Sequence, residues 1–158
     1  MSSIIQDLFG AAKDTKSILG VIGEEKRKTR GTRNAILSEV EFNMTLIFDH
    51  LLAHNADPEK IIRMLKIEHL ANAIDTGFDF TKIKRGRIGV RVVAGVGFLK
   101  HFVGSDCEEL LKNIRFHIEQ LKILPDLYRL KKNRRIRIKR RIKNLGTRYM
   151  LFTKFLSF

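Results

Sequence analysis

The sequence predicts an all-α protein, a bundle of four to five helices with one irregular, glycine-containing connection at about residues 78–104. Apolar residues recur at steps of three and four through most of the chain, which is the spacing that gives a helix one buried face. A chain of 158 residues, 44% of them hydrophobic, is long enough to bury a sizeable core. No repeat or linker divides it, so we expect a single helical domain over residues 1–158.

The first expected helix covers residues 3–23. Its apolar positions recur at helical spacing: Ile4, Ile5, Leu8, Ala12, Thr15, Leu19 and Ile22. Three glycines weaken this helix, each by about 1 kcal/mol relative to alanine. We expect the polar segment from Glu24 to Arg33 to form a loop or a frayed helix end.

Two helices are expected next, at residues 32–55 and from Pro58 to about Gly77. The first has one apolar face, which Phe48 and Leu52 widen: Leu37, Val40, Met44, Ile47, Leu51 and His54. Asp57 suits the N-cap of the second helix and Pro58 its first turn. The second helix carries a shorter apolar set: Ile61, Ile62, Leu65, His69 and Ala73. A connection of a few residues makes the two helices antiparallel neighbours.

The connection at residues 78–104 is the least regular part of the sequence. Phe78 and Phe80 are expected to be buried. The alternation at residues 88–93 fits a short strand, whereas residues 92–103 fit a short helix weakened by glycines, and the pattern does not decide between them.

A further helix is expected at residues 105–131, where Ser105 and Glu108 fit a capping box and Pro125 introduces a kink or an end. Its apolar stripe has helical spacing: Leu110, Leu111, Ile114, His117, Ile118, Leu121 and Leu124. The last helix is expected at about residues 134–156. Its seam repeats at steps of four and three: Ile138, Ile142, Leu145, Tyr149, Phe152 and Leu156.

Positive charge is concentrated in the second half of the chain. The net charge is +14, yet residues 1–79 hold 10 Lys and Arg against 12 Asp and Glu, whereas residues 80–158 hold 21 against 5. The densest stretch, residues 129–148, has 11 cations and no acid. Such a block repels itself, which indicates an anionic partner: nucleic-acid phosphate, lipid head groups or an acidic protein face.

We predict that the strongly basic C-terminal helix, about residues 129–156, contacts nucleic-acid phosphate, because phosphate binding needs cations and little else. The candidate binding residues are its cations: Lys131, Lys132, Arg134, Arg135, Arg137, Lys139, Arg140, Arg141, Lys143 and Arg148. A secondary basic cluster lies in the irregular connection: Lys82, Lys84, Arg85 and Arg87. No helix-turn-helix spacing is present, and without tryptophan a base-stacking platform is weak, so we expect backbone contacts with little sequence preference.

The leading hypothesis is a non-enzymatic binding subunit of a larger nucleic-acid-processing or defence complex, with a protein partner on its apolar faces. One alternative is a protein–protein scaffold whose basic helix docks on an acidic partner surface. Another is a peripheral membrane protein, because residues 3–23 are amphipathic and the basic stretch lies beside the aromatic residues 149–158, as in an interfacial anchor.

No catalytic motif stands out, so we predict no enzymatic activity, no metal and no cofactor. Arg63 and His69, with five residues between them, resemble the Arg–spacer–His pair of HEPN-type ribonucleases, which acts at the scissile phosphodiester, so a HEPN-like ribonuclease is a further alternative. His50 and His54 lie one helical turn apart but lack further metal ligands. We expect His54 and His69 to border the core. Cys107 lies in the first turn of a helix, where the helix dipole lowers a thiol pKa.

The remaining composition excludes several classes of protein. One cysteine excludes a disulfide framework, and no apolar run reaches the roughly 18 residues that a membrane span needs. Charged residues interrupt the first apolar stretch, which argues against a secretory signal. We therefore expect a soluble protein of the cytoplasm.

Overall fold

The chain is described by a computed structural model over residues 15–27, 31–130 and 136–158, with side chains from Leu19 onward. The described part is helical and contains no strand, which confirms the predicted all-α bundle. Its elements follow in chain order: α2 (Thr15–Arg27), α3 (Thr32–Thr45), η2 (Leu46–Ala53), α4 (Pro58–Met64), α5 (Glu68–Asp75), η3 (Phe80–Lys82), η4 (Gly97–Phe102), α6 (Cys107–Lys122), α7 (Leu124–Leu127) and α8 (Ile138–Ser157).

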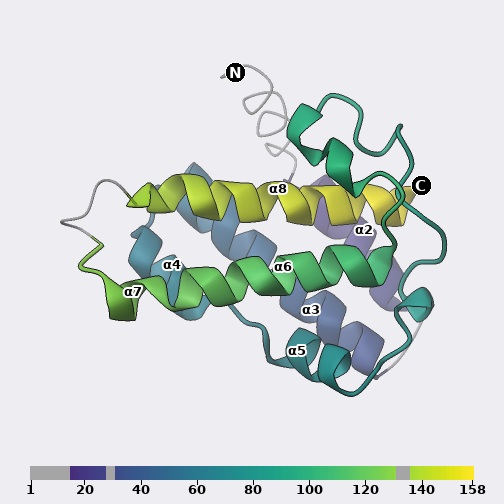
Figure 1. Cartoon of the computed structure of the whole chain (residues 1–158), viewed down its shortest axis with the longest axis horizontal. Helices are drawn as coiled ribbons and strands as arrows, with labels where there is room; N and C mark the ends of the chain where they lie inside the picture. Colours follow the sequence, from purple (N-terminus) through teal and green to yellow (C-terminus); the bar gives the residue numbers. More distant parts are fainter. Residues whose placement is uncertain (1–14, 28–30, 131–135) are drawn as a thin grey trace.

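Helix α8 is the central element of the bundle. It runs antiparallel beside α6 across the front of the molecule, with α3 behind them (Figure 1). It also packs against α2, α4 and η2. The predicted seam is confirmed, because Ile142, Leu145, Tyr149, Phe152 and Leu156 are all buried. This packing leaves only one side of α8 for its charged residues.

The helix predicted at residues 32–55 is present but changes its winding. α3 continues directly into η2, a π-helix in which the backbone hydrogen bonds span five residues. The wider turn buries three consecutive side chains, Leu46, Ile47 and Phe48, as well as Leu51. His54 lies at the exposed end of η2, so the expectation that it borders the core was wrong.

The helix predicted from Pro58 to Gly77 is broken in two at residues 65–67. Asp57 caps α4 as predicted, accepting from the Glu59 N–H at 3.1 Å. At the break, the Asn43 side chain accepts from the Lys66 N–H at 2.8 Å and donates to the Lys66 carbonyl at 2.7 Å. These side-chain contacts satisfy the backbone where helical bonds are missing.

A buried carboxylate then starts α5. The Glu39 oxygens accept from the N–H groups of His69 and Leu70 at 2.9 and 3.0 Å. His69 itself is exposed, which corrects the expectation that it lies at the core edge. A rotation of the chain at the break accounts for this, because residues on the two sides of 65–67 no longer share one helical face.

Helix boundaries differ from the prediction at three further places. α2 extends to Arg27, so Glu24–Arg27 are helical and not a loop. The capping box of α6 lies one residue later than expected, with Asp106 and Glu109 exchanging two bonds of 2.9 Å. α6 ends at Lys122, and after one turn of α7 around Pro125 the chain leaves the helical conformation, so the helix expected over residues 105–131 is shorter.

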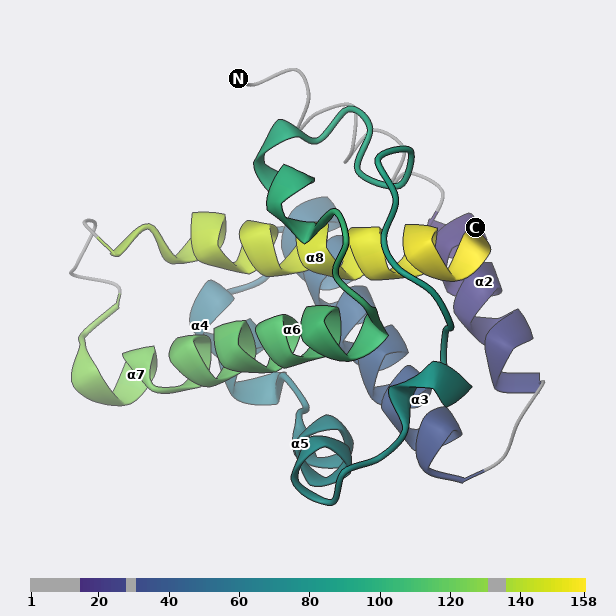
Figure 2. The same cartoon turned by 45° about the vertical axis from the view of Figure 1, so that its right-hand side comes forward.

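The irregular connection at residues 78–104 is confirmed; the strand considered for it is absent, and of the short helix considered at residues 92–103 only Gly97–Phe102 is helical, as the 3₁₀ helix η4. The connection consists of turns and the short 3₁₀ helices η3 and η4, folded beside the C-terminal part of α8 (Figure 2). Two bonds close its base: Ile88 N–H donates to the Ser105 carbonyl at 2.8 Å, and Gly104 N–H donates to the Ile88 carbonyl at 2.9 Å. Its apolar side chains enter the core: Phe80, Ile83, Val92, Val93, Val96, Leu99 and Phe102.

Candidate nucleic-acid interface

The described part of the basic block forms the start of α8. Arg137 precedes the helix in a left-handed conformation with φ 47°, and its carbonyl accepts from the N–H groups of Arg140 and Arg141 at 3.0 and 3.2 Å. The remaining predicted cations of the block, Lys131, Lys132, Arg134 and Arg135, lie outside the described residues. The structure therefore describes six of the ten predicted binding residues.

Four of these six side chains are exposed. Arg137, Lys139, Arg140 and Arg141 face away from the buried seam, whereas Lys143 is half-buried. α8 contains no acidic residue anywhere along its 20 residues. The exposed face of its first two turns is consequently cationic.

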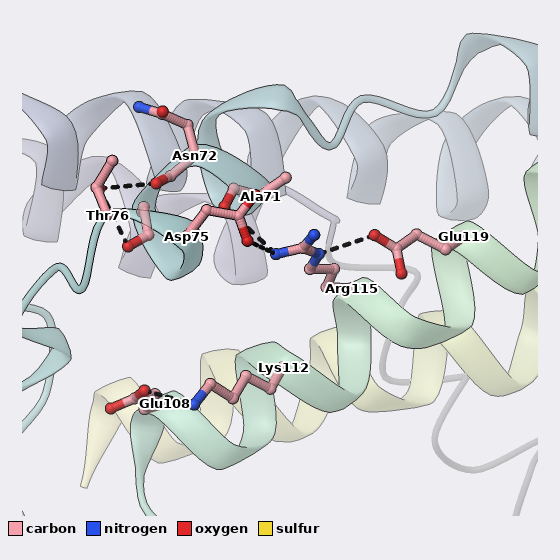
Figure 3. A network of polar contacts seen from close by, with 9 residues as sticks. Ala71, Asn72, Asp75, Thr76, Glu108, Lys112, Arg115 and Glu119 are labelled. Carbon is pink, nitrogen blue, oxygen red and sulfur yellow. Dashed lines mark hydrogen bonds and ion pairs between the residues drawn. The ribbon is translucent and has the colours of Figure 1, made fainter.

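Elsewhere in the described bundle, five Lys and Arg side chains contact carboxylates. On α6, Arg115 binds Asp75 of α5 at 2.7 Å and Glu119 at 2.8 Å, and Lys112 binds Glu108 at 2.7 Å (Figure 3). The other described pairs follow the same pattern: Lys26–Glu41, Arg33–Glu25 and Arg63–Glu59. Each of these five cations therefore has a countercharge within the chain.

Two cations of α8 contact neutral groups instead. Lys139 Nζ donates to the Asn55 side-chain oxygen at 2.6 Å, and Arg148 Nε donates to the Asn113 side-chain oxygen at 2.7 Å. Within the described residues, the guanidinium groups of Arg140 and Arg141 contact no carboxylate. Positive charge therefore stays uncompensated on this face, which favours an external anion.

A hollow of about 240 Å³ lies between α6 and α8, next to the exposed cations. Its lining comes from two short helical stretches: Phe116, His117, Gln120 and Leu121 of α6, and Arg141 and Asn144 of α8. We call it the α6–α8 groove. One turn further along the helices, Arg148 is fixed by Asn113 and by the Asn144 carbonyl, the latter at 2.9 Å. Arg148 thus joins the two walls of the groove and is not a free surface cation.

The electrostatics of His117 reflect the cations around it. Burial, followed by the neighbouring charges of Arg148 and His101, lowers its pKa to about 4. Burial also lowers the pKa of Arg148. His117 is therefore a neutral donor and acceptor at pH 7, in a groove whose charged lining is cationic.

Sequence reasoning did not identify the groove. It placed His117 in the apolar stripe of its helix, and Phe116, Gln120 and Asn144 were not singled out. Phe116 is 54% exposed although it is aromatic. A phenylalanine outside the apolar stripe of an amphipathic helix was the signal that could have pointed to this face.

The secondary basic cluster is a separate feature. Lys84 Nζ donates to the Leu156 carbonyl at 3.5 Å and lies 5.8 Å from the centroid of the Phe155 ring. Arg87 donates to the Gly104 carbonyl at 2.6 Å. The side chains of Lys82 and Arg85 are exposed. A helix rises 1.5 Å per residue, so the 15 residues from Arg141 to Leu156 place this cluster roughly 22 Å along α8 from the first. The two basic regions lie at opposite ends of one helix.

The remaining candidates for chemistry have less support. Cys107 is buried, and burial, with nearby Asp106, raises its pKa to about 12, opposite in direction to the effect of the helix dipole. Arg63 on α4 contacts Glu59 and Asp126, while His69 lies beyond the break, on α5. In the part of the chain that the structure describes, no group of three or more His, Cys, Asp or Glu is placed to hold a metal ion.

Comparisons with known proteins leave the site to be interpreted from its own geometry. No protein-family model matches the chain, and no curated protein or solved structure is significantly similar to it. Among the described helices, none is both long and apolar enough to cross a bilayer.

Proposed function

We propose that this protein binds the phosphate backbone of nucleic acids through the exposed face formed by Arg137, Lys139, Arg140 and Arg141. The observation that carries the proposal is the state of Arg140 and Arg141. Both guanidinium groups are exposed on an acid-free helix and contact no carboxylate of the described chain, whereas five Lys and Arg side chains of the other helices do. Phosphates would supply the missing countercharge.

The proposed role is that of a non-enzymatic binding subunit. Of the nine large apolar side chains that are exposed among the described residues, five lie on α6 or α7, directly beside them in the chain, or on α4, which packs against α6: Met64, Phe116, Ile123, Leu127 and Tyr128. Of these, Phe116 shares the groove with Arg141. Such an apolar area beside a charged one is typical of a subunit that also contacts a protein. A larger nucleic-acid-processing or defence complex in the cytoplasm is the setting we propose.

The same apolar residues favour a second candidate, a scaffold subunit whose basic face docks on an acidic protein surface. The two candidates share the cationic face and differ in its ligand. They are separated by whether the isolated chain binds nucleic acid near physiological salt.

Fluorescence anisotropy with a 30-base-pair duplex and a single-stranded RNA, at several salt concentrations, tests the proposal. We expect the log–log plot of duplex affinity against salt to fall with a slope of about −0.9 per phosphate contacted. The double variant Arg140→Glu/Arg141→Glu should lose at least about tenfold in affinity for both ligands, since it reverses two phosphate contacts.

The matched control is Arg91→Glu/Lys100→Glu, which makes the same change in net charge on exposed residues of the irregular connection that belong to neither basic cluster. It should retain most of the affinity. Equal losses in the two double variants would mean that net charge alone attracts the nucleic acid. Absence of binding near physiological salt would reject the proposal in favour of the acidic protein partner.

A further inference from the structure

Phe116 is an exposed aromatic ring at the edge of a cationic groove. Its side chain is 54% exposed, whereas Leu121, which lines the groove with it, is buried. Exposing a phenylalanine forgoes about 1.5–3 kcal/mol of burial free energy. Phe116 is not part of the hydrophobic core, and its exposed ring offers a surface that fits a ligand with an apolar, flat face.

The polar groups of the groove surround that ring. Gln120 and Asn144 carry exposed side chains with amide donors and acceptors, and both line the groove, one from each helix. Arg141 adds a guanidinium group, and no carboxylate lines the groove among the residues that the structure describes. The groove therefore offers a stacking surface, amide groups for hydrogen bonding and one positive charge within a single small volume.

A nucleobase with its adjoining phosphate has the complementary chemistry. The base has a flat π-face and an edge of donors and acceptors, and the phosphate lies next to it on the backbone. The volume of about 240 Å³ is below the range of pockets for drug-sized ligands, roughly 300–1,000 Å³, and suits one base. Bases in a duplex are stacked on each other and cannot present a face to Phe116, so the ligand must be single-stranded.

We infer that the α6–α8 groove binds an unpaired base of single-stranded nucleic acid, with the base stacked on Phe116 and the adjacent phosphate at Arg141. The inference rests on the proposed function, because the cationic face brings the strand to the groove. It adds a preference for single strands, which phosphate contacts alone do not provide. His117, neutral and half-buried, lies beside the stacking ring with its centroid 5.6 Å away.

The test compares a single-stranded 12-mer with a 30-base-pair duplex, by anisotropy in one buffer. Phe116→Ala should weaken binding of the single strand by about 5- to 100-fold, the effect of removing one stacking aromatic, and leave duplex affinity within about twofold. Phe116→Tyr should keep the affinity of the wild-type protein. Ile123→Ala, at an exposed apolar residue just after the end of α6 and outside the groove, is the matched control and should change neither affinity.

A set of 12-mers, each with one abasic site at a different position, supplies a second readout. With the wild-type protein, one abasic position should weaken binding, and with Phe116→Ala the same strand should bind as tightly as the intact one, because the stacked partner is already missing. Equal loss of duplex and single-strand affinity in Phe116→Ala, or no loss in either, would overturn the inference while leaving the phosphate proposal standing. If Arg140→Glu/Arg141→Glu also leaves both affinities unchanged, the proposed function itself is rejected.

An acidic peptide is the competing occupant. Poly-glutamate should displace the strand only at high concentration, and its own binding should not depend on Phe116, since a carboxylate chain has no face to stack. Poly-glutamate binding that Phe116→Ala weakens as much as it weakens the single strand would assign the groove to an acidic peptide and overturn the inference.

Discussion

Glu39 shows how one buried side chain can define an element far away in the sequence. It is 5% exposed, and its carboxylate accepts two backbone N–H groups at the start of α5. Glu39→Ala leaves both donors without an acceptor, so we expect a loss of about 1–3 kcal/mol in the free energy of unfolding. Urea denaturation measures it. Ser38→Ala, at an exposed neighbouring residue, should change the free energy of unfolding by less than about 0.5 kcal/mol. Similar effects of the two changes would contradict the capping role of Glu39.

Cys107 should be an unreactive thiol in the folded protein. Burial raises its pKa to about 12, so the nucleophilic thiolate is scarce at pH 8. We expect labelling by a disulfide reagent at pH 8 to be at least about 100-fold slower in the native protein than in urea. The rate in urea is the control for reagent and thiol, and a native rate close to it would show that the thiol is accessible.

His117 should make the protein less stable in acid. Its pKa is lowered to about 4 in the folded state, whereas an unfolded histidine titrates near 6.5. The unfolded chain therefore takes up a proton first, so this contribution to stability is complete above about pH 6.5 and is lost as the pH falls towards 4. Urea midpoints from pH 7 to 4 measure it. His117→Gln should make the urea midpoint depend less on pH, whereas His50→Gln, at an exposed histidine, should not. An unchanged pH dependence in His117→Gln would contradict the assignment of the acid sensitivity to His117.

At the scale of elements, α8 approaches η2 so closely that position 146 needs glycine. A Cβ on Gly146 would lie 3.0 Å from Ile47 Cγ2 and 3.3 Å from Phe48 Cζ, and both neighbours are buried in the core. We expect Gly146→Ala to lose about 1–2 kcal/mol of stability, because overpacking exceeds the gain of about 1 kcal/mol in helix propensity. Thermal or urea unfolding measures the difference.

Gly20→Ala is the control for that change. Gly20 also lies inside a helix, but nothing is within 4 Å of the position of its Cβ. The alanine there should raise stability by about 0.5–1 kcal/mol, through propensity alone. If Gly146→Ala stabilises the protein, η2 shifts to make room for the added methyl group, and the contact does not restrict this position.

The elements that the sequence predicts correctly are those whose signals are local. The seam of α8, the Asp57–Pro58 start of α4 and the irregular connection all follow from residues close together in the chain. The break at residues 65–67 was not predictable in this way. It depends on Asn43 and on Lys122, whose Nζ contacts the Leu65 carbonyl at 2.5 Å. Such partners become visible only when α3 and α6 are in place.

The same distinction applies to the candidate site over the whole molecule. The charge asymmetry is readable from the sequence, and it predicts that the last helix carries most of the cations. Which cations remain exposed depends on where acids and amides lie in space: Arg115 is paired with Asp75, and Arg148 is bound by Asn113. The groove needs two helices side by side, so no single stretch of sequence contains it.

An uncompensated cationic face should make the stability of the whole molecule depend on salt. With a net charge of +14, the folded chain is under self-repulsion, which salt screens over a Debye length of about 10 Å at 0.1 M. We expect the melting temperature to rise as the NaCl concentration increases from about 20 to about 500 mM, because the screening length shortens severalfold. Arg140→Gln/Arg141→Gln should melt at a higher temperature than the wild type at the lowest salt, and the difference should shrink at the highest.

Lys112→Gln is the control that separates an exposed, unpaired cation from a paired one. Lys112 is bound to Glu108 at 2.7 Å, so neutralising it removes an attraction as well as a repulsion and should not raise the melting temperature at low salt. Equal gains from Lys112→Gln and from the double variant would mean that total charge, and not its placement on α8, sets the salt dependence. A gain confined to the α8 variant would show that this face lowers the stability of the free chain, which is the behaviour expected of residues that serve an anionic ligand.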